Sequence, residues 1–483
     1  MTKRKVFLWL GVLGALTVLV FPIAEMPPLA QRTAAVAVLM VFWWLGEVIP
    51  IYMTAFLPAV LFPLLGIHSA AELSGMYGHS YVLMLLGAFL LAKAIECHDL
   101  HKRLSLAILI RVGGNKRRLL LGFILVTALL SMWITNMAVV LMLLPLALGI
   151  LNQQEPTPDS INFSNALLLG IAYAASIGGT ATLIGTPPNM VFAGMMQQLF
   201  PERGGVDFTY WLKIGLPVVV VFLPVLWIFL VRYYRVSGYL TGDLQLLRAA
   251  DAAQGKMTRA QWSVLMVFVL TALAWVFRGD LSIGSMEIHG WSTWLGVGAF
   301  VHDSTVALGA AILLFLLPDQ QGGRLMNWQQ AKDIPWGVAM FLGGGLALGM
   351  AFKSSGLASF LADQLSSLEM PSGFWLMLLI ICAMIFFTEI NSNTATATIF
   401  LPVLAIVAQR ANMDPMTLMI PATFACSFAF MLPSATGTNT VIFASDRITI
   451  SEMVKVGFWM NLISVVLLTL LLYLVVFPLF DLI

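Results

Sequence analysis

Long runs of apolar residues alternate with short polar stretches along the whole chain. Most runs reach or approach the roughly 20 residues that an α-helix needs to cross the hydrocarbon of a bilayer. The pattern therefore predicts an all-α polytopic membrane protein with about 11 transmembrane helices. The expected spans lie at 6–24, 32–49, 52–66, 80–97, 163–199, 211–231, 260–277, 303–318, 335–353, 416–445 and 456–480.

Two further apolar segments, 118–151 and 372–410, do not fit as single spans. A polar turn divides each of them, with a Thr-Asn pair at 135–136 and a Ser-Asn pair at 392–393. Each arm is short for a full crossing, so we expect two re-entrant helical hairpins whose tips end inside the bilayer. Exposed backbone at that depth is tolerated only where protein or water surrounds it. The tips should therefore face an internal cavity.

The two hairpins are similar in sequence. Thr135 and Ser392 are offset by 257 residues, and so are Pro145 and Pro402. Two other motifs are offset by 250 residues and lie in the spans 163–199 and 416–445, which we expect to be broken helices. Duplicated halves with polar breaks in corresponding apolar segments are typical of the substrate site of a secondary transporter. The broken-helix motifs read Gly185-Thr186-Pro187-Pro188-Asn189 and Ala435-Thr436-Gly437-Thr438-Asn439.

Positive charge predicts the orientation, because cytoplasmic loops carry an excess of Lys and Arg. The basic residues at 3–5 place the N-terminus in the cytoplasm, and counting crossings places the basic segments 102–118 and 232–259 there too. The first hairpin then enters from the cytoplasm and the second from outside, as in an inverted repeat. The expected units are an extra N-terminal helix (1–31), a first repeat (32–233), a cytoplasmic linker (234–259) and a second repeat (260–483).

Composition supports a membrane environment and narrows the function. The chain is 60% hydrophobic and 10% charged, whereas soluble domains carry about 25% charged residues. We expect an integral protein of a bacterial inner membrane that contacts lipid and no nucleic acid. The sequence has no G-x-x-x-x-G-K-[ST] loop, metal-ligand cluster or catalytic triad, which argues against an ATP-driven pump and against an enzyme.

The chemistry of the breaks suits a cation and an anion together. An interrupted helix leaves carbonyls at one end, which suit a hard cation, and amides at the next start, which suit an anion. No Lys or Arg occurs between Leu119 and Glu202, so bound cations would have to neutralise the anion. The plainer alternative is that each hydroxyl bonds back to its own helix and each Asn bridges helices. Four motifs in repeat-related positions favour the ligand site.

Glu389 is the lone acid in the hairpin cores, and Met132 takes the equivalent place in the first repeat. A buried acid in a membrane segment is a functional candidate, for example as a proton carrier. Because the first repeat has no counterpart, a structural or tuning role is the favoured interpretation.

At these motifs the chain resembles the divalent anion/sodium symporter (DASS) family over nearly its full length. The residues that carry the resemblance are Ser392-Asn393-Thr394, Gly178-Gly179-Thr180 with the first broken-helix motif, and Cys426 to Pro433 running into Asn439. The resemblance implies eleven spans, two re-entrant hairpins, a homodimer, and elevator movement of a transport domain against a scaffold. It also implies two sodium sites around one shared carboxylate site.

Carried over by motif, the resemblance implies three ligand sets. Sodium site 1 would comprise Ser131, Thr135, Asn136 and Gly185, and sodium site 2 would comprise Thr388, Ser392, Asn393 and Ala435. The substrate would contact Asn136, Thr186, Pro187, Asn393, Thr394, Thr436 and Gly437. Two departures fall on the substrate face: Met137 where the family usually has Thr, and Gly437-Thr438 where it usually has Pro-Pro.

The favoured function is sodium-coupled import of a dicarboxylate such as succinate, malate or fumarate, with sodium ions co-transported. A sodium-independent carboxylate exchanger and a symporter of sulfate or another oxyanion are the alternatives on the same fold. A cation/proton antiporter would need paired core acids, and only Glu389 is present. A receptor or scaffold gives no reason to duplicate the polar breaks.

Overall fold

The computed structural model describes residues 3–240, 245–283, 286–319, 322–366, 373–480 and 482. Within these ranges the chain is built almost entirely of α-helices, many of them apolar around their whole circumference, as expected for helices between lipid and a protein core. The helices of the first half are α1 (Lys3–Val20), α2 (Pro28–Gly46), α3 (Ile51–Thr54), α4 (Leu57–Leu64), α5 (Ala70–Tyr77), α6 (Ser80–Cys97), α7 (Leu100–Val112), α8 (Lys116–Ser131), α9 (Asn136–Leu151), α10 (Pro158–Gly179), α11 (Pro187–Leu199), the 3-10 turn Pro201–Arg203, α12 (Phe208–Tyr233) and α13 (Gln245–Gln254).

The second half has a short antiparallel hairpin directly after its first helix, β1 (Leu281–Ile283) with β2 (Met286–Ile288), in which Leu281 pairs with Ile288. Its helices are α14 (Arg259–Val276), α15 (Trp291–Trp294), α16 (Asp303–Leu316), α17 (Trp328–Ala331), α18 (Trp336–Ser354), α19 (Leu357–Ser366), α20 (Gly373–Thr388), α21 (Asn393–Arg410), α22 (Met416–Ser427), α23 (Gly437–Phe443), α24 (Ile450–Leu471), a π-helical turn (Leu472–Val476) and α25 (Phe477–Leu479).

Seven helical segments in the described residues are long and apolar enough to cross a membrane. The other expected spans fall on shorter apolar helices, on α1, or on helices that a break divides. The seven are Pro28–Gly46, Ala70–Cys97, Pro158–Gly179, Phe208–Tyr233, Arg259–Val276, Trp336–Ser354 and Ile450–Leu479.

Both segments that we expected to be hairpins form two helices joined by a tight turn. In the first, α8 and α9 meet at residues 132–135, and in the second, α20 and α21 meet at 389–392. Residue 372, the expected start of the second hairpin, lies outside the described residues. Both expected breaks are also present, at 180–186 between α10 and α11 and at 428–436 between α22 and α23.

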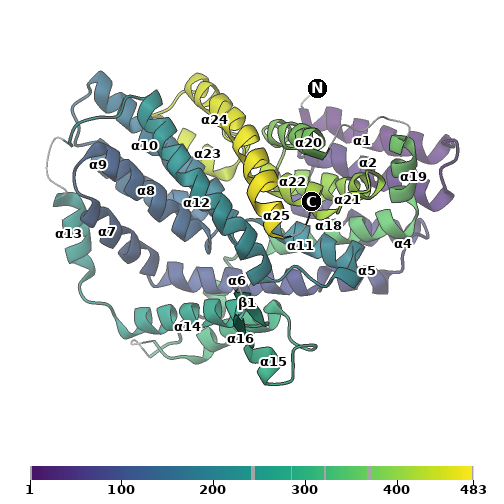
Figure 1. The fold of residues 1–483 in the computed structure, drawn as a ribbon, viewed down its shortest axis with the longest axis horizontal. Coiled ribbons are helices and arrows are strands. Elements are labelled where there is room, and N and C mark those ends of the chain that lie inside the picture. The colour runs from purple at the N-terminus through teal and green to yellow at the C-terminus, as the bar shows by residue number, and fades with distance from the viewer. Residues whose placement is uncertain are drawn as a thin grey trace.

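Corresponding helices pack in corresponding ways. The first hairpin arm α8 packs on α10, and its counterpart α20 packs on α22. The connecting helices α7 and α19 begin 257 residues apart, each directly after a residue with positive φ, Asp99 (52°) and Gly356 (79°). They lie toward opposite ends of the long axis of the molecule, with α6 running along that axis (Figure 1).

Close helix contacts depend on small residues. A Cβ on Gly87 of α6 would lie 2.7 Å from the carbonyl carbon of Ala307 in α16, and one on Gly178 of α10 would lie 2.5 Å from the Cα of Ala128 in α8. Small residues at such crossings let helix backbones approach each other, which is how membrane helices gain packing energy. These contacts fix the frame around the two breaks and the two hairpin tips.

Candidate functional site

Four helices begin at one cavity of 430 Å³ in the middle of the molecule. The residue before the first helical residue is Thr135 for α9, Thr186 for α11, Ser392 for α21 and Thr436 for α23, and all four line the cavity. The apolar pattern of the sequence alone does not explain why these four helix N-termini lie at one cavity. The two hairpins and the two breaks bring them together jointly, because α9 packs on α23 and α11 packs on α21.

Three of the four capping positions leave their helix uncapped. Ser and Thr at this position normally accept a hydrogen bond from the second or third backbone amide of the helix. Thr135, Thr186 and Ser392 make no such bond, whereas Thr436 accepts one from the amide of Asn439. Backbone amides and hydroxyls are therefore available at the cavity, where a ligand can form the missing hydrogen bonds.

Each hairpin tip is held by the same hydrogen bonds. The Ser131 hydroxyl lies 2.5 Å from Asn136 Oδ1 and 2.8 Å from the carbonyl oxygen of Ala175 in α10. In the second half the Thr388 hydroxyl lies 2.8 Å from Asn393 Oδ1 and 2.9 Å from the carbonyl oxygen of Cys426 in α22. Both amide oxygens are thereby oriented by a fully buried hydroxyl.

The breaks are also stabilised alike. The Nδ2 of Asn189 donates to the carbonyl of Thr182 at 2.7 Å and to that of Gly179 at 3.3 Å. The Nδ2 of Asn439, 250 residues later, donates to the carbonyls of Leu432 and Ala429, both at 3.1 Å. These bonds satisfy carbonyls that an interrupted helix would otherwise leave open.

Backbone crowding explains two glycines of the first break. A Cβ on Gly179 would lie 2.4 Å from Asn136 Oδ1, and a Cβ on Gly185 would lie 2.4 Å from the Gly179 carbonyl oxygen. Any larger residue would push the hairpin tip away from the break. Asn136, Gly179 and Gly185 are therefore closely packed, with Asn136 Oδ1 and the Gly179 carbonyl oxygen at the contacts.

The structure brings the predicted site residues together. All of them except Ser131 and Thr388 line the 430 Å³ cavity, and those two are buried directly behind Asn136 and Asn393. The predicted residues on the cavity wall are Thr135, Asn136, Gly185, Thr186, Pro187, Ser392, Asn393, Thr394, Ala435, Thr436 and Gly437.

Sequence reasoning missed the opposite wall. Glu47, Tyr52, Phe89, Pro335 and Val338 also line the cavity. They belong to helices outside the hairpins and breaks and carry no repeated polar motif, so the sequence offered no signal for them. Met137 lines the cavity too, beside Asn136.

Positive charge in the cavity comes from the backbone, whereas Glu47, which also lines the cavity, is an acidic side chain. Among the described residues that line it, none is Lys, Arg or His. Each helix N-terminus carries roughly half a positive charge, so four of them approach the charge needed to balance a dianion. Three of these helices have 13 to 18 residues, and α23, with 7, contributes less. Bound cations would add the remaining compensation.

Glu389 serves as a hydrogen-bond acceptor for the second break. Its Oε1 accepts from the backbone amides of Phe430 (2.7 Å) and Met431 (2.9 Å) and from Asn461 Nδ2 (2.8 Å), and its Oε2 accepts from the amide of Leu432 (3.0 Å). Four donors around a carboxylate that is 3% exposed favour a fixed anion that joins the hairpin tip to the break.

The first half makes the equivalent connection without a charge. There the hydroxyl of Thr182 donates to the carbonyl of Met132 at 2.5 Å. Met132 is the counterpart of Glu389, and Thr182 is the counterpart of Leu432. The two tips are therefore attached to their breaks by different chemistry.

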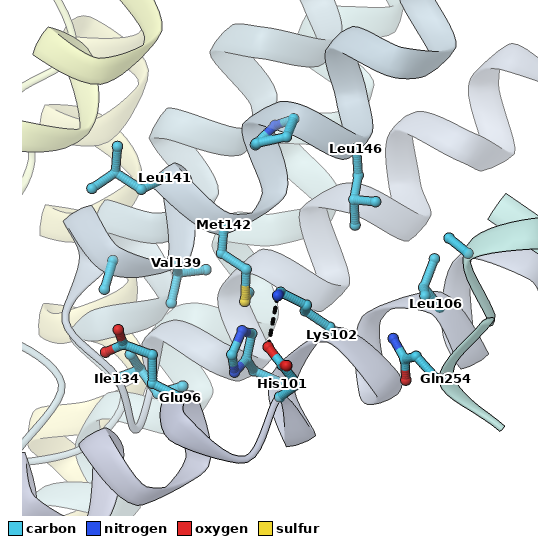
Figure 2. Close-up of a pocket in the computed structure, with 14 residues that line it drawn as sticks. Glu96, His101, Lys102, Leu106, Ile134, Val139, Leu141, Met142, Leu146 and Gln254 are labelled. Carbon is cyan, nitrogen blue, oxygen red and sulfur yellow. Dashed lines mark ion pairs between the residues drawn. The ribbon is translucent and has the colours of Figure 1, made fainter. Parts of the chain in front are cut away.

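A larger cavity lies away from these residues. Figure 2 shows this cavity of 760 Å³, which α7, α9 and α13 enclose. Leu141, Met142 and Leu146 of α9 form an apolar side, and Lys102 pairs with Asp99 at 2.6 Å on the other side. It contains none of the predicted binding residues, although its lining residue Ile134 directly precedes Thr135.

A second cavity, of 580 Å³, occupies the repeat-equivalent place. Its lining residues Lys353, Ser359 and Pro402 are offset by 257 from Glu96, Lys102 and Pro145 of the first cavity. The two cavities thus flank the two hairpins in the same way.

Known proteins resemble this chain over its full extent. It is 37% identical over 478 residues to the sodium-dependent dicarboxylate transporter SdcS of Staphylococcus saprophyticus, covering 96% of this chain and 90% of that protein. It is also 37% identical over 485 residues to the protein of the same name from Staphylococcus aureus, covering 98% of this chain and 91% of the relative.

Two solved structures share the fold. The Alcanivorax borkumensis YdaH transporter aligns with a TM-score of 0.52 at 16% identity, covering 98% of both chains. Neisseria gonorrhoeae MtrF aligns with a TM-score of 0.56 at 13% identity, covering 97% of both. The family model described as the sodium:sulfate symporter transmembrane region matches residues 3–480. The chain is therefore a member of the sodium:sulfate symporter family of membrane transporters.

Proposed function

We propose that this chain is a secondary transporter that couples sodium to the import of a dicarboxylate such as succinate, malate or fumarate. The observation that carries the proposal is the cavity at which four helix N-termini and two Ser/Thr-Asn tips meet, with no basic side chain among the described residues of its lining. Relatives at 37% identity that are named sodium-dependent dicarboxylate transporters support the same substrate class. The expected location is a bacterial inner membrane.

The proposed sodium sites use the hairpin tips. Site 1 comprises Ser131, Thr135, Asn136 and Gly185, and site 2 comprises Thr388, Ser392, Asn393 and Ala435. Hydroxyl, amide and backbone oxygens are the hard ligands that a small cation prefers. The asparagines belong to both a sodium site and the substrate site, because their oxygen can bind a cation while their nitrogen donates to a carboxylate.

The proposed substrate site lies between the sodium sites. Asn136, Asn393, Thr186, Thr394 and Thr436 offer hydroxyl and amide groups to the carboxylates, and Pro187 and Gly437 begin the helices whose amides face them. Sodium supplies positive charge that no side chain of this cavity provides. Substrate binding and sodium binding therefore depend on each other.

The proposed movement follows from the arrangement of the two cavity walls. The hairpins and broken helices form the unit that carries the substrate, and the helices that contribute Glu47, Tyr52, Phe89, Pro335 and Val338 form a fixed scaffold. With a cytoplasmic N-terminus and inverted repeats, the ends of α2 and α18 that carry most of these scaffold residues face the cytoplasm. This conformation then opens inward, and an elevator movement in a homodimer would expose the site outside.

Uptake into proteoliposomes tests the function. The purified protein is given labelled succinate, malate, fumarate, citrate or sulfate, with and without an inward sodium gradient. We expect dicarboxylate uptake that requires sodium. Equal uptake without sodium would instead identify an exchanger, and preference for sulfate would identify an oxyanion symporter.

Calorimetry tests the coupling itself. Because linkage between two sites is reciprocal, succinate affinity should rise with sodium concentration and sodium affinity should rise by the same factor with succinate. Thr135→Ala should lower both apparent affinities, and lithium should replace sodium only partly. Succinate affinity that stays constant from zero to high sodium would contradict symport.

A further inference from the structure

Met137 and Gly437, one residue from each of the two motif departures, lie next to each other. Met137 is the second residue of α9, and Gly437 is the first residue of α23, 300 positions later. A Cβ on Gly437 would lie 3.0 Å from Met137 Sδ and 3.3 Å from Met137 Cγ. A Cβ at position 437 would therefore pack tightly against the methionine side chain, which would have to shift by a few tenths of an ångström.

Both residues lie on the cavity wall. Met137 is 48% exposed, and Gly437 is exposed as well. Their repeat counterparts, Thr394 and Pro187, line the same cavity. At these repeat-related positions the cavity thus has a threonine in the second half and a methionine in the first half.

The two side chains differ in what they can offer a ligand. A threonine hydroxyl is both a donor and an acceptor, whereas a thioether is at most a weak acceptor. A thioether is also flexible and polarisable, so it packs well against methylene groups. The wall formed by Met137 therefore suits the hydrocarbon part of a ligand.

We propose that Met137 and Gly437 act together as a specificity determinant that selects compact dicarboxylates with an unsubstituted hydrocarbon centre. An added hydroxyl or a third carboxylate that faces Met137 would lose its water without gaining a hydrogen bond. Gly437 makes this arrangement possible because it leaves room for the thioether. The inference rests on the proposed function and refines its substrate class.

Competing substrates test the role of Met137. Sodium-driven uptake of succinate, malate and citrate into proteoliposomes is measured for the wild type, for Met137→Thr, and for Met142→Thr. Met142 is the matched control because it lies on the same helix but lines the 760 Å³ cavity. We expect Met137→Thr to raise kcat/KM for malate relative to succinate about tenfold, and Met142→Thr to leave this ratio unchanged.

A double-mutant cycle tests the pair. Gly437→Ala should reduce succinate kcat/KM about tenfold in the wild type, because the new Cβ meets the thioether, and much less in a Met137→Ala background. Equal losses in both backgrounds, or an unchanged malate-to-succinate ratio in Met137→Thr, would overturn the inference. Absence of sodium-driven succinate uptake in the wild type would instead contradict the proposed function.

Discussion

Asn136 and Asn393 show how a single side chain can serve two ligands. Each amide oxygen is oriented by a buried hydroxyl five residues earlier, on the other side of the hairpin turn. The hydroxyl of Ser131 lies 2.5 Å from Asn136 Oδ1, and that of Thr388 lies 2.8 Å from Asn393 Oδ1. That contact fixes the amide plane, so the oxygen and the nitrogen point in defined directions. A residue that holds both the cation and the anion transmits the presence of one to the other.

Replacing either asparagine should therefore abolish transport without unfolding the protein. We expect Asn136→Ala and Asn393→Ala each to reduce sodium-driven succinate uptake at least a hundredfold, because each removes a ligand of both sodium and substrate. Thermal denaturation in detergent should show a folded protein. Asn162→Ala, on α10 and outside the cavity wall, is the control. Near wild-type uptake in either variant would contradict the paired-site arrangement.

Glu389 leads to a second prediction. If it joins the hairpin tip to the break, Glu389→Gln should place an NH₂ group against backbone donors and lower stability by about 2 kcal/mol. Sodium affinity should fall, because Thr388 is its direct neighbour in the chain. Met132→Gln, at the equivalent position, is the control. A variant that keeps sodium affinity but loses a pH dependence of transport would instead identify Glu389 as a proton carrier.

At this scale the sequence indicated the residues that line the cavity better than the residues that support them. The Ser/Thr-Asn pairs are visible because they interrupt apolar sequence twice at one spacing. Three of the four donors to Glu389 are backbone amides, which no side-chain pattern can reveal. The contact between Met137 and Gly437 joins residues 300 positions apart, so the sequence revealed two departures but not their relation.

Helices and breaks were predictable to within a few residues. The turn positions at 132–135 and 389–392 coincide with the polar motifs. Non-helical backbone within a bilayer is tolerated only where protein or water surrounds it, so a polar break in an apolar run marks such a turn. The expected start of one span, 163, was late. The helix α10 starts at Pro158, where Thr157 and Ser160 form a capping box. These polar residues lower the mean hydropathy of the first turn, so a hydropathy profile places the start of the span too late. The short helix α5 was also missed.

The contact between α8 and α10 yields a third prediction. Gly178→Ala would place a methyl group 2.5–2.6 Å from backbone atoms of Ala128, which cannot rotate away. The resulting shift should cost about 1–3 kcal/mol of stability and weaken sodium binding at the first tip. Gly309→Ala is the control, because a Cβ there has open space and alanine favours the helix. Equal melting temperatures for both variants would contradict the close packing.

For the whole molecule, the inverted arrangement remains a prediction that labelling can test. In a background without Cys97, Cys382 and Cys426, a cysteine at Asp159 should react with an impermeant reagent from the cytoplasm. Ser372, the natural choice for the other face, lies outside the described residues, and exposed Asn412 after α21 tests that face instead. Asn412 should react from outside. Reaction of both from one side would exclude inverted halves.

The exchange of contacts between the halves also constrains how the protein is made. The first hairpin arm α9 completes its packing with α23, and α11 packs on α18, α21 and α22. A ribosome must therefore synthesise nearly the whole chain, to about residue 443, before α9 can pack on α23. Until then, the surfaces of α9 and α11 that pack on the second half lack those contacts. Biogenesis of this chain thus includes a long interval in which the first half exists without its contacts to the second half.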